Sequence, residues 1–356
     1  MVIKTNIKSI KTNSEVNSEN EAEINQKRQI VIELKNVSFS YPKGPVKSQE
    51  VLPALSNINM KIYKGERVAI LGPNGGGKTT LLRILDALTE VSKGSISALG
   101  FNLTEDMNNK KKMFKFRKKV GFVFQNPDEE LFSPTVYDDI IFGPLHLGLS
   151  KEEIEKRANS VMDLFSIQNI KDKHPYNLSG GEKKKASIAA VLSIDPDIIL
   201  FDEPTSGLDP KSRADLISII NELHKRGKTI ITATHDVNAT LEIADRVYVL
   251  NKHVIAEGPI REIFSDVKLL KDTNLEIPEI LKLFKILSAF GYNCEELPLS
   301  INEAIDQITQ TIETEGGHIH LHIHEHTHND LKNLKHDFDH NHHFHSVSAH
   351  AYEDEN

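Results

Sequence analysis

The segment Gly72–Thr80, "GPNGGGKTT", constrains the fold more than any other part of the chain. It satisfies the pattern G-x-x-x-x-G-K-[ST], with Gly72, Gly77, Lys78 and Thr79 in the fixed places. The short apolar run "RVAIL" precedes it, and "TTLLRILDAL", which has helical spacing, follows. A strand, a glycine-rich turn and a helix in this order predict a phosphate-binding loop.

Each residue type in this loop suits a phosphate group. Glycines allow backbone N–H groups to converge on phosphate oxygens, and Lys78 offers a positive charge to the β- and γ-phosphates. The Thr79 hydroxyl can serve as a ligand for Mg²⁺, and the N-terminus of the helix that follows favours anions. A glycine-rich turn that binds nothing is the alternative, but the flanking strand and helix argue against it. The predicted binding residues are Gly72, Pro73, Asn74, Gly75, Gly76, Gly77, Lys78, Thr79 and Thr80.

The wider pattern alternates strands with helices. "DIILFDEP" and "TIITATHD" are typical of buried strands, and the helix "SRADLISIINELHKRG" separates them. This alternation predicts an α/β fold with a parallel, wound sheet. After about residue 265 the pattern becomes helical. We therefore expect a disordered leader (1–28), an ATPase domain (29–265), a small helical C-terminal extension (266–315) and a His-rich low-complexity tail (316–356).

Composition excludes several classes of protein. A formal net charge of −8 argues against a dedicated nucleic-acid binder. The single cysteine, Cys294, cannot form an intramolecular disulfide, which favours a reducing compartment. No apolar run approaches the ~18 residues of a membrane span, so other chains would have to supply any spans. The basic run Lys110–Lys119 is typical of a solvated helix face, with contact to anionic lipid as the weaker alternative.

Two carboxylates follow the apolar strand "IILF". Asp202 and Glu203 stand at the end where an α/β sheet binds its ligands. We expect Asp202 to hold Mg²⁺ and Glu203 to act as the general base that polarises an attacking water. The pair alone is a weak signal, but a phosphate-binding loop upstream strengthens it.

Further motifs resemble those of the ABC-type ATPases. "LSGGE" resembles the family's signature motif, and "FVFQNP", "SGLDP" and "TATHD" resemble its glutamine, aspartate and histidine loops. The resemblance covers residues from about 30 to 265. It implies a P-loop ATPase domain with a helical subdomain, and it implies roles in nucleotide binding or hydrolysis for Tyr41, Gln125, Ser179, Gly180, Gly181, Asp209 and His235. Taken singly, Gln125 is as readily a polar loop residue, and His235 a structural histidine at a strand end.

The same resemblance implies a composite active site. Two ATPase domains would pair head to tail around two ATP molecules, each site taking its P-loop from one subunit and Ser179 from the other. Thr79, Gln125 and Asp202 would hold Mg²⁺, and Tyr41 would stack on adenine. A full set of motifs makes a homodimer sufficient, although pairing with a related ATPase stays an alternative.

Two features of other ABC ATPases that the sequence does not show, and two segments that it does show, indicate the type of ABC ATPase. The DNA-repair type carries a very long coiled coil between P-loop and signature, and no sustained heptads lie between Lys78 and Ser179. The ribosome type carries two ATPase domains, whereas one is visible here. "FQNPDEELFSPTVYDDIIFGP" and the helical extension resemble the ATPases of energy-coupling-factor transporters, which import vitamins, cobalt or nickel. The departures are "SGGE" in place of the more common glutamine and a long leader.

The tail adds a hypothesis about cargo. Twelve of the 17 histidines lie between His318 and His350, and six recur at every second residue, which would put them on one face of an extended strand. Imidazole is a favoured ligand for Ni²⁺ and Co²⁺. The candidate ligands are His318, His320, His322, His324, His326, His328, His340, His342, His343 and His345. A solvated tract without function is the alternative.

These observations predict an ATP-hydrolysing subunit that energises import of cobalt or nickel. It would work at the cytoplasmic face of the membrane with a transmembrane coupling subunit and a substrate-binding membrane subunit, and without nucleic acid. A vitamin importer and a metal-storage or metallochaperone protein with a regulatory ATPase are the alternatives.

Overall fold

A six-stranded sheet forms the centre of the computed structural model, which describes residues 29–41, 53–290, 292 and 296–314. The strand order is β10-β9-β3-β8-β7-β6, and every neighbouring pair is parallel except β10 with β9. The strands are β3 (Arg67–Leu71), β6 (Val120–Val123), β7 (Ile198–Asp202), β8 (Thr229–Thr234), β9 (Arg246–Asn251) and β10 (His253–Pro259). All residues of β7 and β8 are buried, as parallel strands covered on both faces require.

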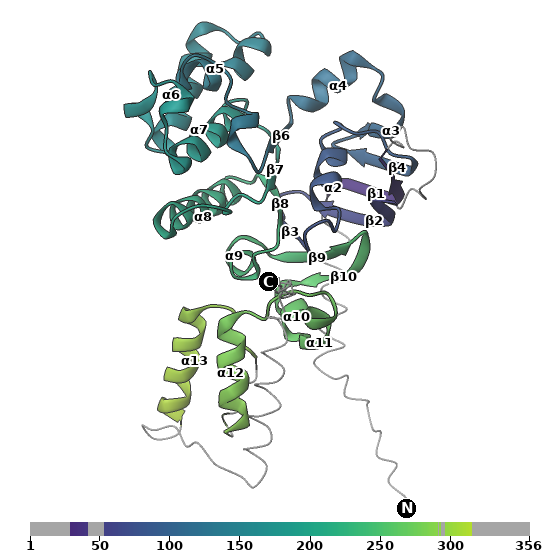
Figure 1. The fold of residues 1–356 in the computed structure, drawn as a ribbon, viewed down its shortest axis with the longest axis vertical. Helices are drawn as coiled ribbons and strands as arrows, with labels where there is room; N and C mark the ends of the chain where they lie inside the picture. The colour runs from purple at the N-terminus through teal and green to yellow at the C-terminus, as the bar shows by residue number, and fades with distance from the viewer. Residues whose placement is uncertain (1–28, 42–52, 291, 293–295, 315–356) are drawn as a thin grey trace, which may run out of the picture.

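Helices connect these strands in the wound arrangement that the sequence predicts. The helix α2 (Lys78–Leu85) follows β3, α8 (Pro210–Lys225) joins β7 to β8, and α9 (Val237–Ile243) joins β8 to β9. Between β6 and β7 the chain builds a lobe of three helices that stands away from the sheet (Figure 1). Its members are α5 (Val136–His146), α6 (Lys151–Leu164) and α7 (Gly180–Leu192). The expected helical subdomain is therefore confirmed.

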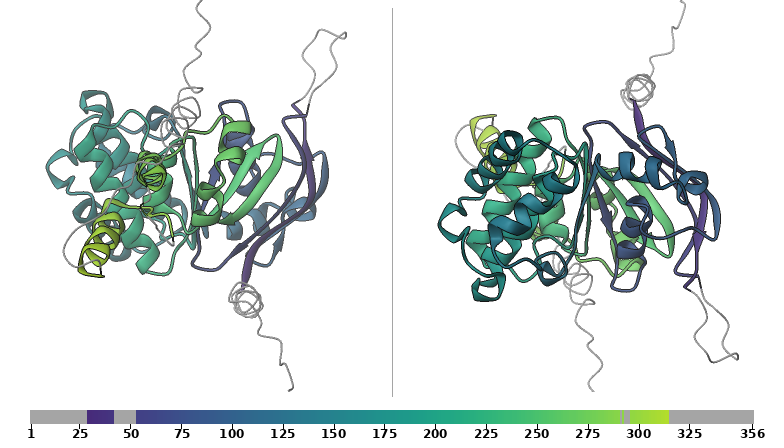
Figure 2. Two further views of the ribbon diagram at one scale, coloured as in Figure 1. Left: turned by 90° about the horizontal axis from the view of Figure 1, so that it is seen from below. Right: turned by 90° about the horizontal axis from the view of Figure 1, so that it is seen from above.

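A second, antiparallel sheet was not expected from the sequence. Its order is β2-β1-β4-β5, built from β1 (Ile30–Phe39), β2 (Leu55–Tyr63), β4 (Lys93–Ala98) and β5 (Phe101–Asn102). It lies beside α2, on the side of the molecule opposite the helical lobe (Figure 2). Two helices follow it, α3 (Leu103–Asp106) and α4 (Lys110–Arg117). In α4 the side chains of Met113 and Phe116 are buried while the lysines are exposed, so the basic run forms a solvated helix face.

The strand β7 contributes to two hydrophobic cores because alternate side chains of a strand point to opposite faces. Ile198 and Leu200 pack into the core between the two sheets, which surrounds α2. Ile199 and Phe201 pack into the core beneath α8 and the helical lobe. Packing on both faces holds the carboxyl end of β7 rigidly, and the two candidate carboxylates stand at that end.

Four helices follow β10, namely α10 (Ile260–Ser265), α11 (Val267–Asp272), α12 (Glu279–Ala289) and α13 (Ile301–Thr314). Leu270 and Leu281, from α11 and α12, share a hydrophobic cluster with Leu71 and Val249 of the central sheet. The extension is thus attached to the central sheet by a common core. No helix in the described part of the chain is long and apolar enough to cross a membrane. The leader and the His-rich tail lie outside the described residues.

Candidate active site

The turn between β3 and α2 needs glycine for steric reasons. Gly77 has φ = +98°, in the left-handed region, and a Cβ there would lie 2.6 Å from Leu55 Cδ2 and 2.8 Å from the Ala54 carbonyl oxygen. A Cβ on Gly72 would lie 2.0 Å from the Leu250 carbonyl oxygen. No side chain caps the N-terminus of α2, because the N-cap residue is Gly77 itself. The first N–H groups of this helix therefore face the loop, where an anion satisfies them.

Lys78 places a buried positive charge inside this loop. Its side chain is 7% exposed, and its Nζ donates to the carbonyl oxygens of Gly72 at 2.8 Å and Pro73 at 3.2 Å. The same Nζ lies 3.5 Å from Oε1 of Glu203. A phosphate bound in the loop therefore meets an ammonium group that is already oriented, so little conformational entropy is lost on binding.

Asp202, the last residue of β7, has the environment of a metal ligand. It is 2% exposed, and its Oδ1 has no hydrogen-bond partner although it is buried. Burial raises the pKa of this carboxyl, while a hydrogen bond from the Thr79 side chain lowers it. A carboxylate and a hydroxyl side by side are oxygen ligands of the kind Mg²⁺ prefers, and a bound cation would satisfy Oδ1. The residues present thus fit Mg²⁺.

Glu203 is held on three sides by its neighbours. Its backbone has φ = +45°, which is strained for a residue with a Cβ, and its N–H donates to the Ala233 carbonyl at 2.8 Å. Oε2 accepts a hydrogen bond from the Thr234 hydroxyl at 3.0 Å, and Oε1 lies 2.9 Å from Nδ1 of His235. Because the carboxylate has two fixed partners and lies beside Lys78, its orientation toward the pocket is set before any ligand binds.

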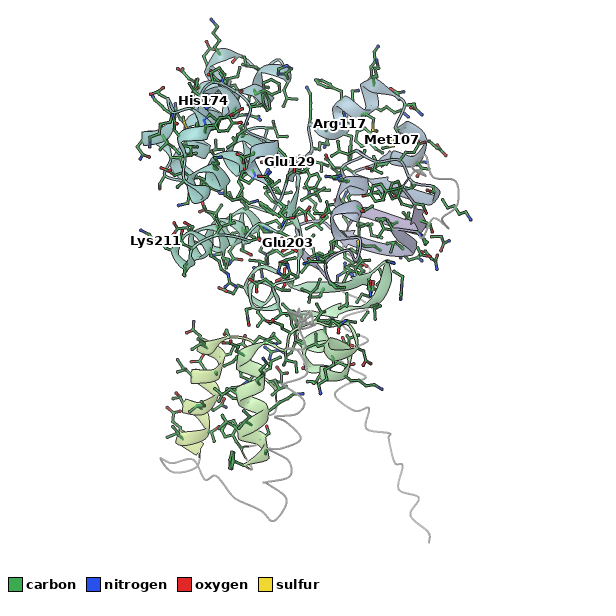
Figure 3. All side chains as sticks on the ribbon, viewed as in Figure 1. Met107, Arg117, Glu129, His174, Glu203 and Lys211 are labelled. Carbon is green, nitrogen blue, oxygen red and sulfur yellow. The ribbon has the colours of Figure 1, made fainter. Side chains whose placement is uncertain are left out.

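One pocket of about 570 Å³ is lined by most of the residues predicted for the ATP site. Its walls include the glycine-rich loop, Gln125, Glu203 and His235, and Figure 3 shows Glu203 near the middle of the molecule in that view. Tyr41 stands at the rim, where its hydroxyl lies 2.9 Å from the Thr80 hydroxyl. Tyr41 is 52% exposed, which leaves ring surface for stacking.

Two residues that line this pocket were missed by the sequence analysis. Ala54 has no chemical signature and reaches the pocket only because β2 packs beside the loop. Ser206 belongs to "SGLDP", and its position three residues after Glu203 is a signal that could have found it.

Ser179, Gly180 and Gly181 do not line this pocket. Ser179 is the N-cap of α7, where it forms a capping box with Glu182. A Cβ on Gly181 would lie 3.1 Å from the Ser212 hydroxyl and 4.0 Å from Asp209 Oδ2. Asp209 in turn caps α8 through the N–H groups of Lys211 and Ser212, at 3.0 and 3.1 Å. The predicted residues therefore form two groups, one around Lys78 and one around Ser179 and Asp209.

Comparison with known proteins decides the family. A family model described as "ABC transporter" matches residues 55–206. A protein of Methanocaldococcus jannaschii named as an ABC transporter ATP-binding protein is 49% identical over 284 residues, which cover 80% of this chain and 98% of the relative. The chain belongs to the ABC transporter ATP-binding proteins. ABC ATPase domains of this kind hydrolyse ATP in step with transport and use ATP with Mg²⁺, so the ATPase prediction is confirmed.

The relatives of this ABC ATPase include a more specific group. The energy-coupling factor transporter ATP-binding protein EcfA of Methanococcus maripaludis is 41% identical over 286 residues, or 80% of this chain and 99% of the relative. Among solved structures, cbiO1 from Clostridium perfringens, described as part of the ABC transporter complex cbiONQ, has 35% identity and a TM-score of 0.60. That match covers 72% of this chain and 99% of cbiO1. The resemblance to energy-coupling-factor ATPases is therefore confirmed.

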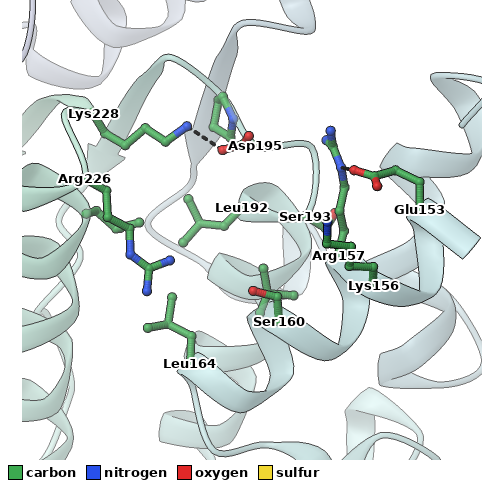
Figure 4. A pocket seen from close by; sticks show the side chains of 13 residues that line it. Glu153, Lys156, Arg157, Ser160, Leu164, Leu192, Ser193, Asp195, Arg226 and Lys228 are labelled. Atoms are coloured by element: carbon green, nitrogen blue, oxygen red, sulfur yellow. Dashed lines mark hydrogen bonds and ion pairs between the residues drawn. The ribbon is translucent and has the colours of Figure 1, made fainter.

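A second cavity, of about 290 Å³, lies between α6 and the ends of α7 and α8 (Figure 4). Most of its charges are paired within its own wall, since Lys228 lies 2.5 Å from Asp195 and Arg157 lies 2.7 Å from Glu153. Lys156 and Arg226 have no carboxylate partner in this wall, and none of the motif residues lines the cavity.

If Glu203 accepts the proton of the attacking water, Glu203→Gln should keep ATP binding but lower turnover by about 10²–10⁴-fold, because the amide cannot act as a base. ATPase rates and nucleotide affinity measured on the same preparation test this. Near-normal turnover in this variant would show that Glu203 is not the general base. Lys78→Ala is the contrasting variant, in which affinity for ATP itself should fall because a buried cation is deleted.

The steric requirement at Gly77 predicts that Gly77→Ala weakens nucleotide binding. The added methyl group meets the Ala54 carbonyl oxygen and Leu55, and φ = +98° is unfavourable for alanine, so the loop has to shift. Gly75→Ala is the matched control, since its φ is also positive at +76° but a Cβ there meets nothing within 4 Å. Titration with ATP should show a larger loss for Gly77→Ala. Equal losses would mean that backbone strain alone, and not contact with Ala54 and Leu55, governs the loop.

Proposed function

We propose that this chain is the ATP-hydrolysing subunit of an energy-coupling-factor-type importer of cobalt or nickel ions. The observation that carries the ATPase part is the convergence of Lys78, Glu203 and His235 on one pocket. The sequence identity between this chain and EcfA proteins supports the assignment to this class of transporter. The membrane spans would belong to separate subunits, a transmembrane coupling protein and a substrate-binding protein, and this chain would dock on their cytoplasmic side.

Each residue has a chemical task in this mechanism. Lys78 and the loop N–H groups bind the β- and γ-phosphates and oppose the negative charge that develops during transfer. Glu203 takes a proton from the attacking water, and His235 and Thr234 hold its carboxylate in position. Thr79 and Asp202, with Gln125, would hold Mg²⁺, which supplies charge neutralisation on the phosphates when bound.

Hydrolysis would need a second subunit. Ser179 begins α7 outside the pocket that contains Lys78, so it would reach the γ-phosphate only of an ATP held by a partner chain. A dimeric ATP-binding cassette bound to ADP and phosphate is similar to this chain, with 31% identity, a TM-score of 0.58 and coverage of 65% of this chain and 99% of the cassette. That likeness supports a head-to-tail dimer with two composite sites, and a homodimer is the simplest form.

The cargo assignment depends on the tail. The histidines of the tail lie outside the described residues, so the cargo assignment is supported by the sequence pattern together with the family. We infer that residues His318–His350 bind the transported ion or a sensor pool of it, because neutral imidazoles at alternating positions are good ligands for Ni²⁺ and Co²⁺. A vitamin importer with an incidental tail is the second candidate, favoured by the same energy-coupling-factor relatives.

Composite sites predict complementation between two inactive chains. Ser179→Arg blocks one half of each site and Lys78→Ala the other, so either homodimer should be inactive. A mixed dimer purified through two different tags holds one site with both halves intact. It should recover up to about half of wild-type turnover if the sites act independently. If the mixed dimer is as inactive as the two parent homodimers, either the sites are not shared between subunits or one intact site is not enough for turnover. Nickel-affinity tags must be avoided because the tail itself is rich in histidine.

The tail hypothesis predicts several Ni²⁺ or Co²⁺ ions per chain, with binding that weakens as pH falls through about 6.5, where free imidazoles become protonated. Titration calorimetry with Ni²⁺ on the full chain and on a chain that ends at residue 315 measures this. A control with the six alternating histidines His318–His328 changed to asparagine keeps the length and removes six of the ten candidate ligands, so its Ni²⁺ uptake should fall between those of the other two chains. Basal ATPase activity should be equal in all three. Equal Ni²⁺ uptake would contradict the hypothesis.

A further inference from the structure

Lys184 is a buried cation that has no role in the ATPase mechanism described above. It lies in α7, the helix that Ser179 begins, and it is 4% exposed. Its Nζ donates to the backbone carbonyl oxygens of Phe124 at 2.8 Å and of Gln125 at 3.1 Å. The side chain of Lys184 thus joins the signature helix directly to the segment that carries Gln125 into the ATP pocket.

Two carboxylates, Glu130 and Asp202, act electrostatically on this ammonium group. Glu130 accepts a hydrogen bond from the Phe124 N–H through Oε1 at 2.5 Å, and its Oε2 is buried without a hydrogen-bond partner. Burial raises the pKa of Glu130 to about 7, and the charge of Lys184 opposes that rise. Burial raises the pKa of Asp202 and lowers the pKa of Lys184, and the opposite charges of these two groups act against both shifts. Lys184 is therefore coupled electrostatically to Glu130 and to the proposed Mg²⁺ ligand.

The two neighbouring lysines behave differently. Lys183 pairs with Asp128 at 2.7 Å and Lys185 with Asp215 at 2.9 Å, and both side chains remain partly exposed, at 17% and 25%. Such surface pairs contribute little to stability. Only Lys184 of this run turns inward, and a buried ammonium is costly unless its hydrogen bonds are satisfied. The carbonyl oxygens of Phe124 and Gln125 accept two of its three N–H donors here.

We propose that Lys184 is a positioning residue for ATP hydrolysis, holding the backbone of Gln125 at a set distance from the signature helix. When a partner's ATP engages Ser179 and shifts α7, Lys184 would move the Gln125 segment with it, toward or away from the bound Mg²⁺ and γ-phosphate. Assembly of the composite site would thereby be coupled to the geometry inside each pocket. This inference rests on the role proposed above for Gln125.

The test is Lys184→Met, which keeps an unbranched apolar chain and removes the ammonium. Affinity for ATP should stay within about twofold of wild type, because the P-loop does not contact Lys184, while kcat should fall about 10- to 100-fold as the Gln125 segment loses its anchor. Lys185→Met is the matched control on the same helix, and its kcat should stay near wild type. Unchanged kcat in Lys184→Met would overturn the proposal.

A double-mutant cycle separates positioning from a general structural role. If Lys184 acts through Gln125, adding Lys184→Met to Gln125→Ala should cause no further loss of kcat. Losses that multiply would overturn the proposal, since Lys184 would then act independently of Gln125. Full activity of Gln125→Ala, beside an inactive Glu203→Gln, would also overturn it and leave the hydrolytic function standing.

Lys184→Gln supplies a second measurement that depends on hydrogen bonding and not on volume. The amide retains N–H donors for the two carbonyl oxygens, so it should recover part of the turnover that Lys184→Met loses. A lysine that only fills space would be replaced at least as well by methionine, and that ranking would count against the proposal. If Lys184→Met fails to fold, Lys184→Gln carries the same cycle with Gln125→Ala.

Discussion

The parallel pairing of β7, β8 and β3 is the constraint on which the active site depends. These strands are neighbours, with Asp202 opposite Ala233 and Leu71 opposite Thr234, so their carboxyl ends meet at one edge of the sheet. The chain leaves β3 as the glycine-rich loop, leaves β7 as Glu203 and leaves β8 as His235. Three segments distant in sequence thus place an ammonium group, a carboxylate and an imidazole within hydrogen-bonding or ion-pairing distance. A shift of one residue in either register would move these segments about 3.3 Å relative to one another along the strands.

Burial of charge gives this edge its chemistry. Lys78, Asp202 and Glu203 are all less than 10% exposed, which would be unfavourable for any one of them alone. Together they offset one another, while the unpartnered Oδ1 of Asp202 remains as an acceptor for a cation and the backbone of Glu203 remains strained. The strain persists because β7 is packed into cores on both of its faces, which prevents the chain after Asp202 from relaxing.

In the proposed dimer, the helical lobe would contribute the residues that one chain cannot bring to its own ATP. Its signature helix begins at Ser179, beside the start of α8, and is joined to the Gln125 segment by Lys184. The lobe therefore has a contact with the nucleotide pocket that runs through backbone carbonyl oxygens as well as through packing. The similarity of the chain to dimeric cassettes and to EcfA proteins accords with the proposal that the surface around Lys78 binds nucleotide and the surface around Ser179 completes a partner's site.

The sequence by itself determined the elements whose signals are local. The glycine-rich loop and the buried strands β7 and β8 each follow from spacing and residue type within about ten positions, and the structure places them as predicted. Only the tertiary structure decided the antiparallel sheet, because β1 pairs with β4 some sixty residues later and no short pattern records such pairing. It also decided which residue of the run Lys183–Lys185 is buried and that α11 and α12 share a core with β3 and β9. Three adjacent lysines look alike in a sequence, and only the packing of α7 against the Gln125 segment gives one of them two carbonyl oxygens to bind.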